Sequence, residues 1–86
     1  MPKITMFKSP TCGPCRKAGP IVADIAGDLG LILSVLDVSV DPEAARDRNV
    51  TAVPTIILEK DAEEVYRMVG VPNRVEFENV VKEFAK

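Results

Sequence analysis

The chain has 86 residues and a formal net charge of −2 at pH 7, a length that predicts a single domain over residues 1–86. Its two cysteines allow at most one intramolecular disulfide, and the absence of histidine removes the commonest metal ligand and the usual general base near neutral pH. No apolar run reaches the roughly 18 residues of a membrane helix, and the lysine-bearing start is unlike a signal peptide. We therefore expect a cytoplasmic protein with no membrane and no nucleic-acid partner.

The charge is unevenly distributed along the chain. Residues 1–23 carry four basic side chains and no acidic one, whereas the rest carries seven basic and thirteen acidic side chains. Both cysteines lie in the positive part.

The first half of the chain predicts a strand, a helix and a second strand. Lys3–Lys8 contains aromatic and β-branched residues and ends before a Ser-Pro pair, as short strands do. A core-facing helical stripe follows, made of Ala18, Ile21, Val22, Ile25, Ala26 and Leu29, and Gly30 is a plausible stop. In the run Leu31–Val40, both the odd and the even positions are apolar up to Leu36. This pattern predicts a strand buried on both faces.

The second half predicts a short helix, a hairpin and a final helix. Asp41-Pro42-Glu43 is a helix start, with an acidic N-cap and proline at the first position, and the helix runs to about Arg48. Thr55–Glu59 and Glu64–Val69 form an antiparallel hairpin. Asn73 and Glu76 resemble a capping box before a stripe of Phe77, Val80, Val81, Phe84 and Ala85.

These elements give the order βαβαββα. Its first two strands must be parallel and joined by a crossover. The predicted fold class is α/β, with a four-stranded mixed sheet and helices on both faces.

The most informative motif is Cys12-Gly13-Pro14-Cys15. Two cysteines at this spacing form a redox dithiol, half of a metal site, or an incidental pair. A zinc site needs four ligands, and without histidine or a further cysteine the chain cannot complete one from soft ligands. We therefore predict no metal site and favour the redox dithiol.

The position of the motif gives the two thiols different environments. Cys12 lies where a strand ends and a helix begins, and unpaired N–H groups at a helix N-terminus favour an anion such as a thiolate. Cys15 lies three residues before Ala18, on the buried stripe of the helix. We expect Cys12 to attack a substrate disulfide and Cys15 to resolve the mixed disulfide.

With these residues in view, the chain resembles the thioredoxin family, and more narrowly its short, glutaredoxin-like members. The resemblance covers nearly the whole chain. It depends on Cys-Gly-Pro-Cys at 12–15 with Pro20 five residues later, on Val53-Pro54-Thr55 before the third strand, and on Gly70 after the fourth.

The resemblance implies a minimal thioredoxin fold and a set of site residues. The catalytic pair is Cys12 and Cys15. The Val53-Pro54 peptide bond is cis, with Pro54 facing the cysteines and Val53 offering its backbone to an extended substrate. The substrate-binding surface comprises Thr11, Gly13, Pro14, Val53, Pro54 and Gly70.

The chain also departs from the family pattern. Thioredoxins usually place tryptophan where this chain has Thr11, which makes the contact surface smaller and more polar. The buried aspartate and its lysine partner, which handle protons in the family, correspond to Met6 and Val35. The segment Val69–Asn73 lacks the Gly-Gly and acidic residues of glutathione-using glutaredoxins, which argues against a glutathione site.

Three charged groups near the motif have open roles. Arg16 and Lys17 either stabilise the Cys12 thiolate or are solvated helix residues. We favour the second for each taken singly, although their sum with Lys8 and the helix dipole is a better argument for stabilisation. Asp37 either replaces the missing proton acceptor or is a solvated aspartate at a strand end, and we favour the solvated aspartate.

The leading prediction is a protein-disulfide reductase that works as a monomer without a bound cofactor. Its expected partners are disulfide-containing client proteins and, by the resemblance, a flavoprotein reductase that uses NADPH. One alternative is a dedicated electron donor to a single enzyme such as ribonucleotide reductase. A second is a Cys-x-x-Cys metal chaperone, whose βαββαβ order differs from the order predicted here.

Overall fold

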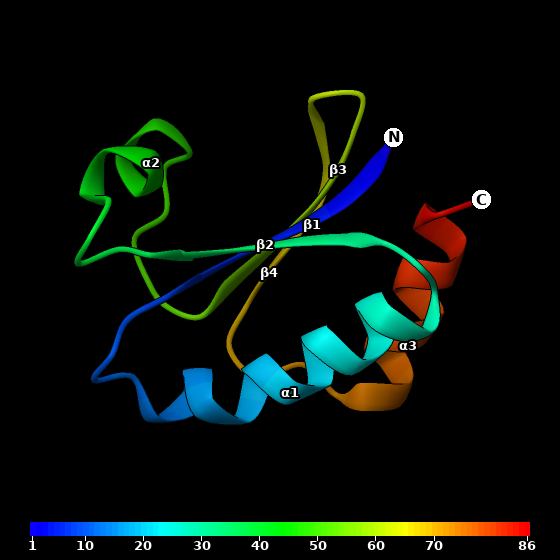
Figure 1. Ribbon diagram of the computed structural model, residues 1–86, viewed down its shortest axis with the longest axis horizontal. Helices are drawn as coiled ribbons and strands as arrows, with labels where there is room; N and C mark the ends of the chain where they lie inside the picture. The colour runs from blue at the N-terminus through cyan, green and yellow to red at the C-terminus, as the bar shows by residue number, and fades with distance from the viewer.

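The computed structural model describes all 86 residues, Met1–Lys86, and contains four strands and three helices (Figure 1). The first half holds β1 (Pro2–Lys8), α1 (Gly13–Asp28) and β2 (Ile32–Asp37). The second half holds α2 (Pro42–Asp47), β3 (Thr55–Lys60), β4 (Glu63–Val69) and α3 (Arg74–Phe84). The predicted order βαβαββα is confirmed, and it differs from the βαββαβ order of the metal chaperones.

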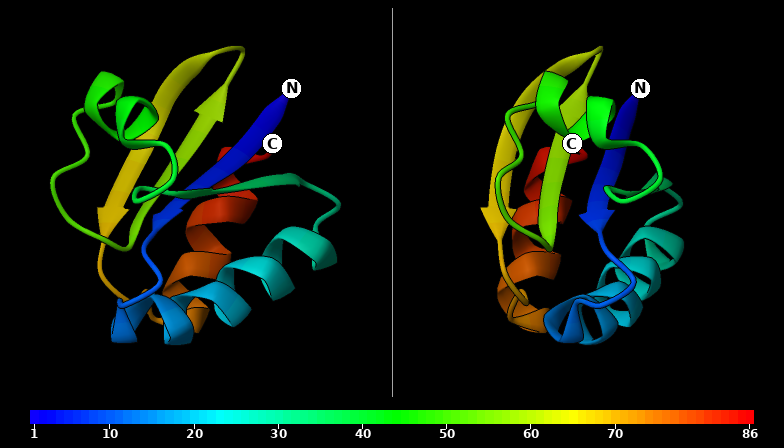
Figure 2. Two further views of the ribbon diagram at one scale, coloured as in Figure 1. Left: turned by 60° about the vertical axis from the view of Figure 1, so that its left-hand side comes forward. Right: turned by 90° about the vertical axis from the view of Figure 1, so that its left-hand side faces the viewer.

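The four strands form one mixed sheet in the order β2-β1-β3-β4. Strand β1 pairs parallel with β2 and antiparallel with β3, and β3 pairs antiparallel with β4. Helices α1 and α3 lie together on one side of the sheet, while α2 lies apart from them (Figures 1 and 2). The predicted mixed sheet is therefore confirmed.

Two apolar clusters lie on opposite faces of the sheet because side chains alternate along a strand. On β1, Ile4 and Met6 join the larger cluster, which contains the buried faces of α1 and α3. Phe7 points the other way and packs with Ile57 and with Ala45 of α2. The predicted stripes of both long helices are thus the faces that close the larger core.

Strand β2 corrects the prediction for the run Leu31–Val40. It is shorter than predicted and forms an edge of the sheet, and Ile32 and Val35 are 50% and 48% exposed. The strand ends at Asp37, where the Asp37 carboxylate accepts hydrogen bonds from the backbone and hydroxyl of Ser39 at 2.8 and 2.6 Å. An edge strand has no neighbouring strand on one side. Apolar residues at both its odd and its even positions therefore do not ensure that it is buried.

Local signals fix the helix ends as predicted. Gly30 adopts a φ of +66°, and the following N–H of Leu31 donates to the carbonyl of Ala26 at 2.8 Å, which closes the end of α1. The Asn73 side chain accepts from the Glu76 N–H at 3.1 Å and caps α3. None of the three helices is both long enough and apolar enough to span a bilayer.

Candidate functional site

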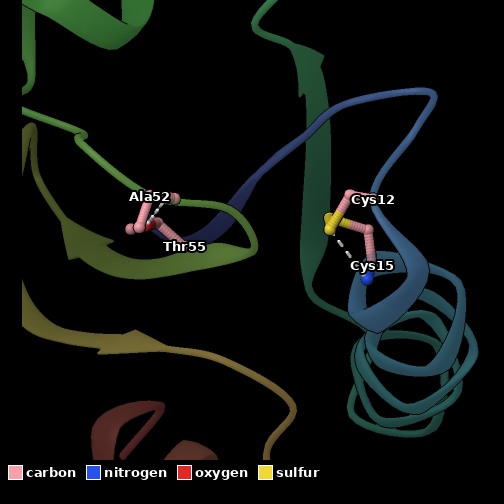
Figure 3. Close-up of a disulfide and its surroundings, with 4 residues drawn as sticks. All are labelled: Cys12, Cys15, Ala52 and Thr55. Carbon is pink, nitrogen blue, oxygen red and sulfur yellow. Dashed lines mark hydrogen bonds between the residues drawn. A yellow bond between two sulfur atoms is a disulfide. The ribbon is translucent and has the colours of Figure 1, made fainter.

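Cys12 directly precedes the first residue of helix α1. It is the N-cap, with extended backbone angles, and its Sγ accepts a hydrogen bond from the backbone N–H of Cys15 at 3.1 Å. The two cysteines are joined by a disulfide, with 5.2 Å between their Cα atoms (Figure 3). The predicted position of Cys12 at the helix N-terminus is confirmed.

The two cysteines differ in exposure. Cys15 is only 6% exposed and belongs to the larger core with Ala18 and Val22, whereas Cys12 is half-buried at the margin of that core. The helical spacing that placed Cys15 on the apolar stripe therefore predicted its burial. The arrangement leaves Cys12 within reach of another molecule and shields Cys15.

Positive charge lies near Cys12, since Lys8 and Arg16 line the same cavity as Cys12. The first turn of α1 contains no acidic side chain, and Lys8, Arg16 and Lys17 all lie within five residues of Cys12 in the sequence. None of these three cations makes an ion pair within 4.0 Å. Their charges and the helix N-terminus favour an anion at this end of the molecule.

The second motif forms a tight connection before β3. The peptide bond between Val53 and Pro54 is cis, as the resemblance implied, and Pro54 is buried. The hydroxyl of Thr55 donates to the carbonyl of Ala52 at 2.6 Å, across the cis bond (Figure 3). The Gly70 N–H donates to the Pro54 carbonyl at 2.9 Å, so the structure brings these two predicted site residues together.

Other predicted site residues lie at the same helix end or on the same core. Thr11, Gly13 and Pro14 flank the cysteines and are exposed. Val53 packs against the larger core, as Cys12 does.

Arg67 fixes the segment that leads to the cis-proline. Its guanidinium donates to the carbonyls of Arg48 and Asn49, at 2.6 and 3.3 Å, where α2 ends. Glu64 holds the guanidinium in place through two hydrogen bonds of 2.8 Å. Strand β4 is therefore tied to the chain just before Val53.

Arg48 extends this ion-pair network to Glu59 on β3. The guanidinium of Arg48 lies 3.3 Å from Glu59 and 3.6 Å from Glu64, and Thr5 donates its hydroxyl to Glu59 at 2.7 Å. Burial alone would raise the pKa of Glu59. The hydrogen bonds from Thr5 and Arg48 outweigh that effect, so the pKa of the Glu59 carboxyl lies below its ordinary value.

The residues that take the place of a buried proton acceptor are apolar. Met6 is 2% exposed and pairs across the strands with Val35. Asp37 lies at the solvated end of β2, where the side-chain and backbone hydrogen bonds from Ser39 lower its pKa. Asp37 therefore lies at a strand end, as predicted, and that it takes no proton from Cys15 stays a prediction.

Three features of the site were missed in the sequence. The first is the hydrogen bond from the Thr55 hydroxyl to the Ala52 carbonyl across the cis bond. The Val-Pro-Thr motif was the sequence signal that could have indicated it. Arg67 gave no signal, because its carbonyl partners belong to a different element. A groove beside the cysteines was also missed, although the small residues Gly19 and Ala23 on the flank of the helical stripe indicated open space there.

Comparisons with known proteins agree with this geometry. The thioredoxin family model matches residues 2–83. The thioredoxin of Mycobacterium tuberculosis is 39% identical over 75 residues, which cover 85% of this chain and 65% of that protein. A bifunctional thioredoxin reductase/thioredoxin of Mycobacterium leprae is 36% identical over 75 residues, which cover 85% of this chain and 16% of that protein.

The fold also matches solved structures. A mutant thioredoxin from Halobacterium salinarum superposes with a TM-score of 0.92 at 25% identity, covering 99% of this chain and 75% of that one. This chain therefore spans about two thirds to three quarters of the length of these thioredoxins.

Proposed function

This chain belongs to the thioredoxin family, and on that premise we propose that it is a thiol–disulfide oxidoreductase that reduces disulfides in client proteins. One observation carries the proposal: a half-buried cysteine at the N-cap of helix α1 is bonded to a second cysteine that is buried one turn later. The pair can cycle between a disulfide and a dithiol without any bound cofactor.

The two thiols have different roles in this cycle. The Cys12 thiolate attacks one sulfur of the client disulfide, which forms a mixed disulfide and releases the other client sulfur as a thiolate. The Cys15 thiol then loses its proton and attacks Cys12 Sγ, which releases the second client thiol and forms the Cys12–Cys15 disulfide. Two electrons pass from the protein to the client.

The Cys12 thiolate has several sources of stabilisation in the reduced protein. The N–H of Cys15 lies within hydrogen-bonding distance of Cys12 Sγ, and unpaired N–H groups at the start of α1 point toward the same end. Lys8, Arg16 and Lys17 add positive charge nearby. A thiolate is the nucleophilic form of cysteine, so these groups favour attack by Cys12.

The client binds across the end of the molecule that holds both motifs. Thr11, Gly13 and Pro14 surround the attacking sulfur, and Val53, Pro54 and Gly70 form the opposite part of this surface. Pro54 supports it from its buried position, with its carbonyl held by Gly70. Thr11 in place of a large aromatic residue keeps the contact area small.

The oxidised protein is regenerated by a flavoprotein reductase that uses NADPH. The Mycobacterium leprae relative, named as a bifunctional thioredoxin reductase/thioredoxin, supports this partner. Dithiols that donate electrons persist in reducing compartments, so we place the reaction in the cytoplasm. The apolar residues Met6 and Val35 support membership of the short, glutaredoxin-like branch.

Two measurements test the proposal. The reduced protein accelerates reduction of the insulin interchain disulfides, whereas the Cys12→Ser variant does not. The midpoint potential of the Cys12–Cys15 couple lies near or below the cytosolic poise, at about −220 mV or lower. A strongly oxidising potential, near about −120 mV, would instead assign the protein to disulfide formation.

A further inference from the structure

A groove of about 380 Å³ opens beside the cysteines. Its walls come from β1, the loop after β1, α1 and β2, and both Cys12 and Cys15 line it. No residue of the Val53-Pro54 connection and no residue near Gly70 contributes to it. The groove therefore lies on a different side of the cysteines from the surface proposed for client proteins.

The floor of the groove is apolar. Met6 is buried beneath it, and Leu33 and Val35 of the edge strand β2 border it. In the wider family, the resemblance places a charged pair at the positions of Met6 and Val35. In this chain, these positions offer apolar contact to a bound molecule.

The groove is open because the adjacent side of α1 has small residues. Gly19 and Ala23 line it from the helix. A Cβ atom placed on Gly19 would meet no other atom within 4 Å, so the space above this glycine is empty. A side chain at position 19 therefore starts in open space, and we expect a larger one to fill part of the groove.

Positive charge lies at one part of the groove. Lys8 and Arg16 line it, and neither makes an ion pair or a side-chain hydrogen bond. Asp37 is the register partner of Lys8 on β2, and its pKa is lowered by the hydrogen bonds from Ser39 and, to a smaller extent, by the Lys8 charge. Asp37 accepts from Ser39 through one oxygen, makes no ion pair with Lys8 within 4.0 Å and does not line the groove. No acidic residue is among the lining residues. The groove is thus complementary to an anion with an apolar body.

We propose that this groove binds a small apolar dithiol that carries a carboxylate and that this ligand reduces the Cys12–Cys15 disulfide. The inference rests on the proposed function and names a second electron donor for the same cysteines. The apolar body contacts Met6, Leu33 and Val35, and the carboxylate faces Lys8 and Arg16. A peptide thiol such as glutathione would place amide groups against an apolar floor that offers them no partners.

The exchange balances as a dithiol–disulfide reaction. A ligand thiolate attacks Cys12 Sγ, which breaks the Cys12–Cys15 bond and releases Cys15 as a thiolate. The second ligand thiolate attacks the ligand sulfur of the mixed disulfide, which closes a cyclic ligand disulfide and releases Cys12 as a thiolate. The ligand loses two electrons and two protons, and the protein gains two electrons. Solvent then protonates the two protein thiolates as their pKa values and the pH require.

The test uses dihydrolipoate as the probe and dithiothreitol as a small reference dithiol without a carboxylate or a long apolar body. The second-order rate constant for reduction of the oxidised protein is measured by acid quench, alkylation and mass spectrometry. In the Gly19→Leu variant, we expect the rate with dihydrolipoate to fall by at least about tenfold, which equals about 1.4 kcal/mol, while the rate with dithiothreitol stays within about twofold.

Gly27→Leu is the matched control. Gly27 lies in the same helix, is exposed, and also has open space at its Cβ position, but it does not line the groove. Both rates in this control stay within about twofold of the wild type. Equal losses for both dithiols in Gly19→Leu, or no loss for either, would overturn the proposal.

A charge test uses the neutral amide of the same dithiol. The ratio of the rates for dihydrolipoate and dihydrolipoamide falls by about fivefold in the double variant Lys8→Gln, Arg16→Gln, as expected for two exposed charge contacts. Because this ratio compares two ligands on one protein, a change in Cys12 reactivity cancels. An unchanged ratio would contradict the role of the two cations.

Insulin reduction by each variant, measured after full reduction, separates this inference from the proposed function. If the wild type fails to reduce insulin, the proposed function is wrong. If insulin reduction is intact and Gly19→Leu leaves the dihydrolipoate rate unchanged, only the groove assignment is wrong.

Discussion

The backbone N–H of Cys15 points at the Sγ atom of Cys12, with 3.1 Å between the nitrogen and the sulfur. In the reduced protein, the same N–H can donate to a Cys12 thiolate, and a charged acceptor makes a stronger hydrogen bond than a neutral one. Cys15 has no comparable position, since it is buried among apolar side chains. The two thiols therefore differ in both access and thiolate fraction.

This asymmetry predicts selective alkylation. In the fully reduced protein, iodoacetamide at neutral pH modifies Cys12 at least about tenfold faster than Cys15, because the thiolate is the reactive form. Peptide mapping by mass spectrometry after brief exposure measures the two rates. Faster modification of Cys15 would show that the roles of the two cysteines are reversed.

The Asp37→Asn variant tests whether a carboxylate takes the Cys15 proton. Asp37 is solvated and its pKa is lowered by Ser39, so it is a weak base and remains an ordinary surface anion. We expect the rate of client reduction to stay within about threefold, whereas loss of a general base typically costs about 10²–10⁴-fold. Asp28→Asn, at the far end of α1, is the control.

The pH dependence of the rate should then follow the thiols alone, without a separate carboxylate limb. Either water or the departing client thiolate accepts the proton from Cys15. A hundredfold loss in Asp37→Asn, with the fold intact, would make Asp37 a catalytic residue.

The Glu59 network predicts acid sensitivity. The pKa of Glu59 is lower in the folded chain than in the unfolded chain, so its contribution to stability is present above the unfolded value and is lost as pH falls through the folded value. The contribution therefore declines below about pH 4.3, the ordinary pKa of glutamate. Glu59→Gln should lower the free energy of unfolding at pH 7 by about 1–2 kcal/mol.

Urea denaturation of Glu59→Gln at pH 7 and at pH 3 checks this sign. The difference from the wild type should shrink between pH 7 and pH 3, because the wild-type carboxylate takes up its proton as the pH falls through its lowered pKa. Glu78→Gln is the control because Glu78 forms only an exposed pair with Lys82 at 2.9 Å. An equal loss at both pH values would mean that Glu59 stabilises by packing rather than by charge.

Gly70 and Gly27 predict opposite effects of the same change. Gly70 has a φ of +98°, which L side chains rarely adopt, although a Cβ there would meet no atom within 4 Å. Gly70→Ala should therefore destabilise by about 1–3 kcal/mol through the backbone alone. Gly27 lies in α1, and Gly27→Ala should stabilise by about 0.5–1 kcal/mol. Thermal denaturation measures both, and a neutral Gly70→Ala would show that the backbone relaxes without cost.

Much of the fold followed from local signals in the sequence. The Cys15–Ala18 stripe gave the buried face of α1, and the Asp41 and Asn73 caps gave the starts of α2 and α3. The parallel pairing of β2 with β1 was predicted correctly, but its burial on both faces was predicted wrongly, because a strand's apolar pattern does not reveal whether a neighbour pairs with it on each side. Ile32 and Val35 are apolar and yet exposed at a sheet edge.

The site divides in a similar way. Cys12 and Cys15 followed from spacing and from the helix start, and the cis bond before Pro54 followed from the family resemblance. The Arg67 contacts and the groove under Gly19 did not follow from the sequence. Both depend on which elements meet in space: no local pattern marks the partners of Arg67, and Gly19 and Ala23 mark a small-residue side of α1 but not the strands that face it.

The most direct test of the central claim is where a client becomes trapped. The Cys15→Ser variant, reduced and then mixed with a disulfide-bonded client, should accumulate a covalent adduct on Cys12, which mass spectrometry locates. The Cys12→Ser variant should form no such adduct, because Cys15 is buried. The account would be contradicted if the Cys12→Ser variant formed an adduct on Cys15 as fast as the Cys15→Ser variant forms one on Cys12.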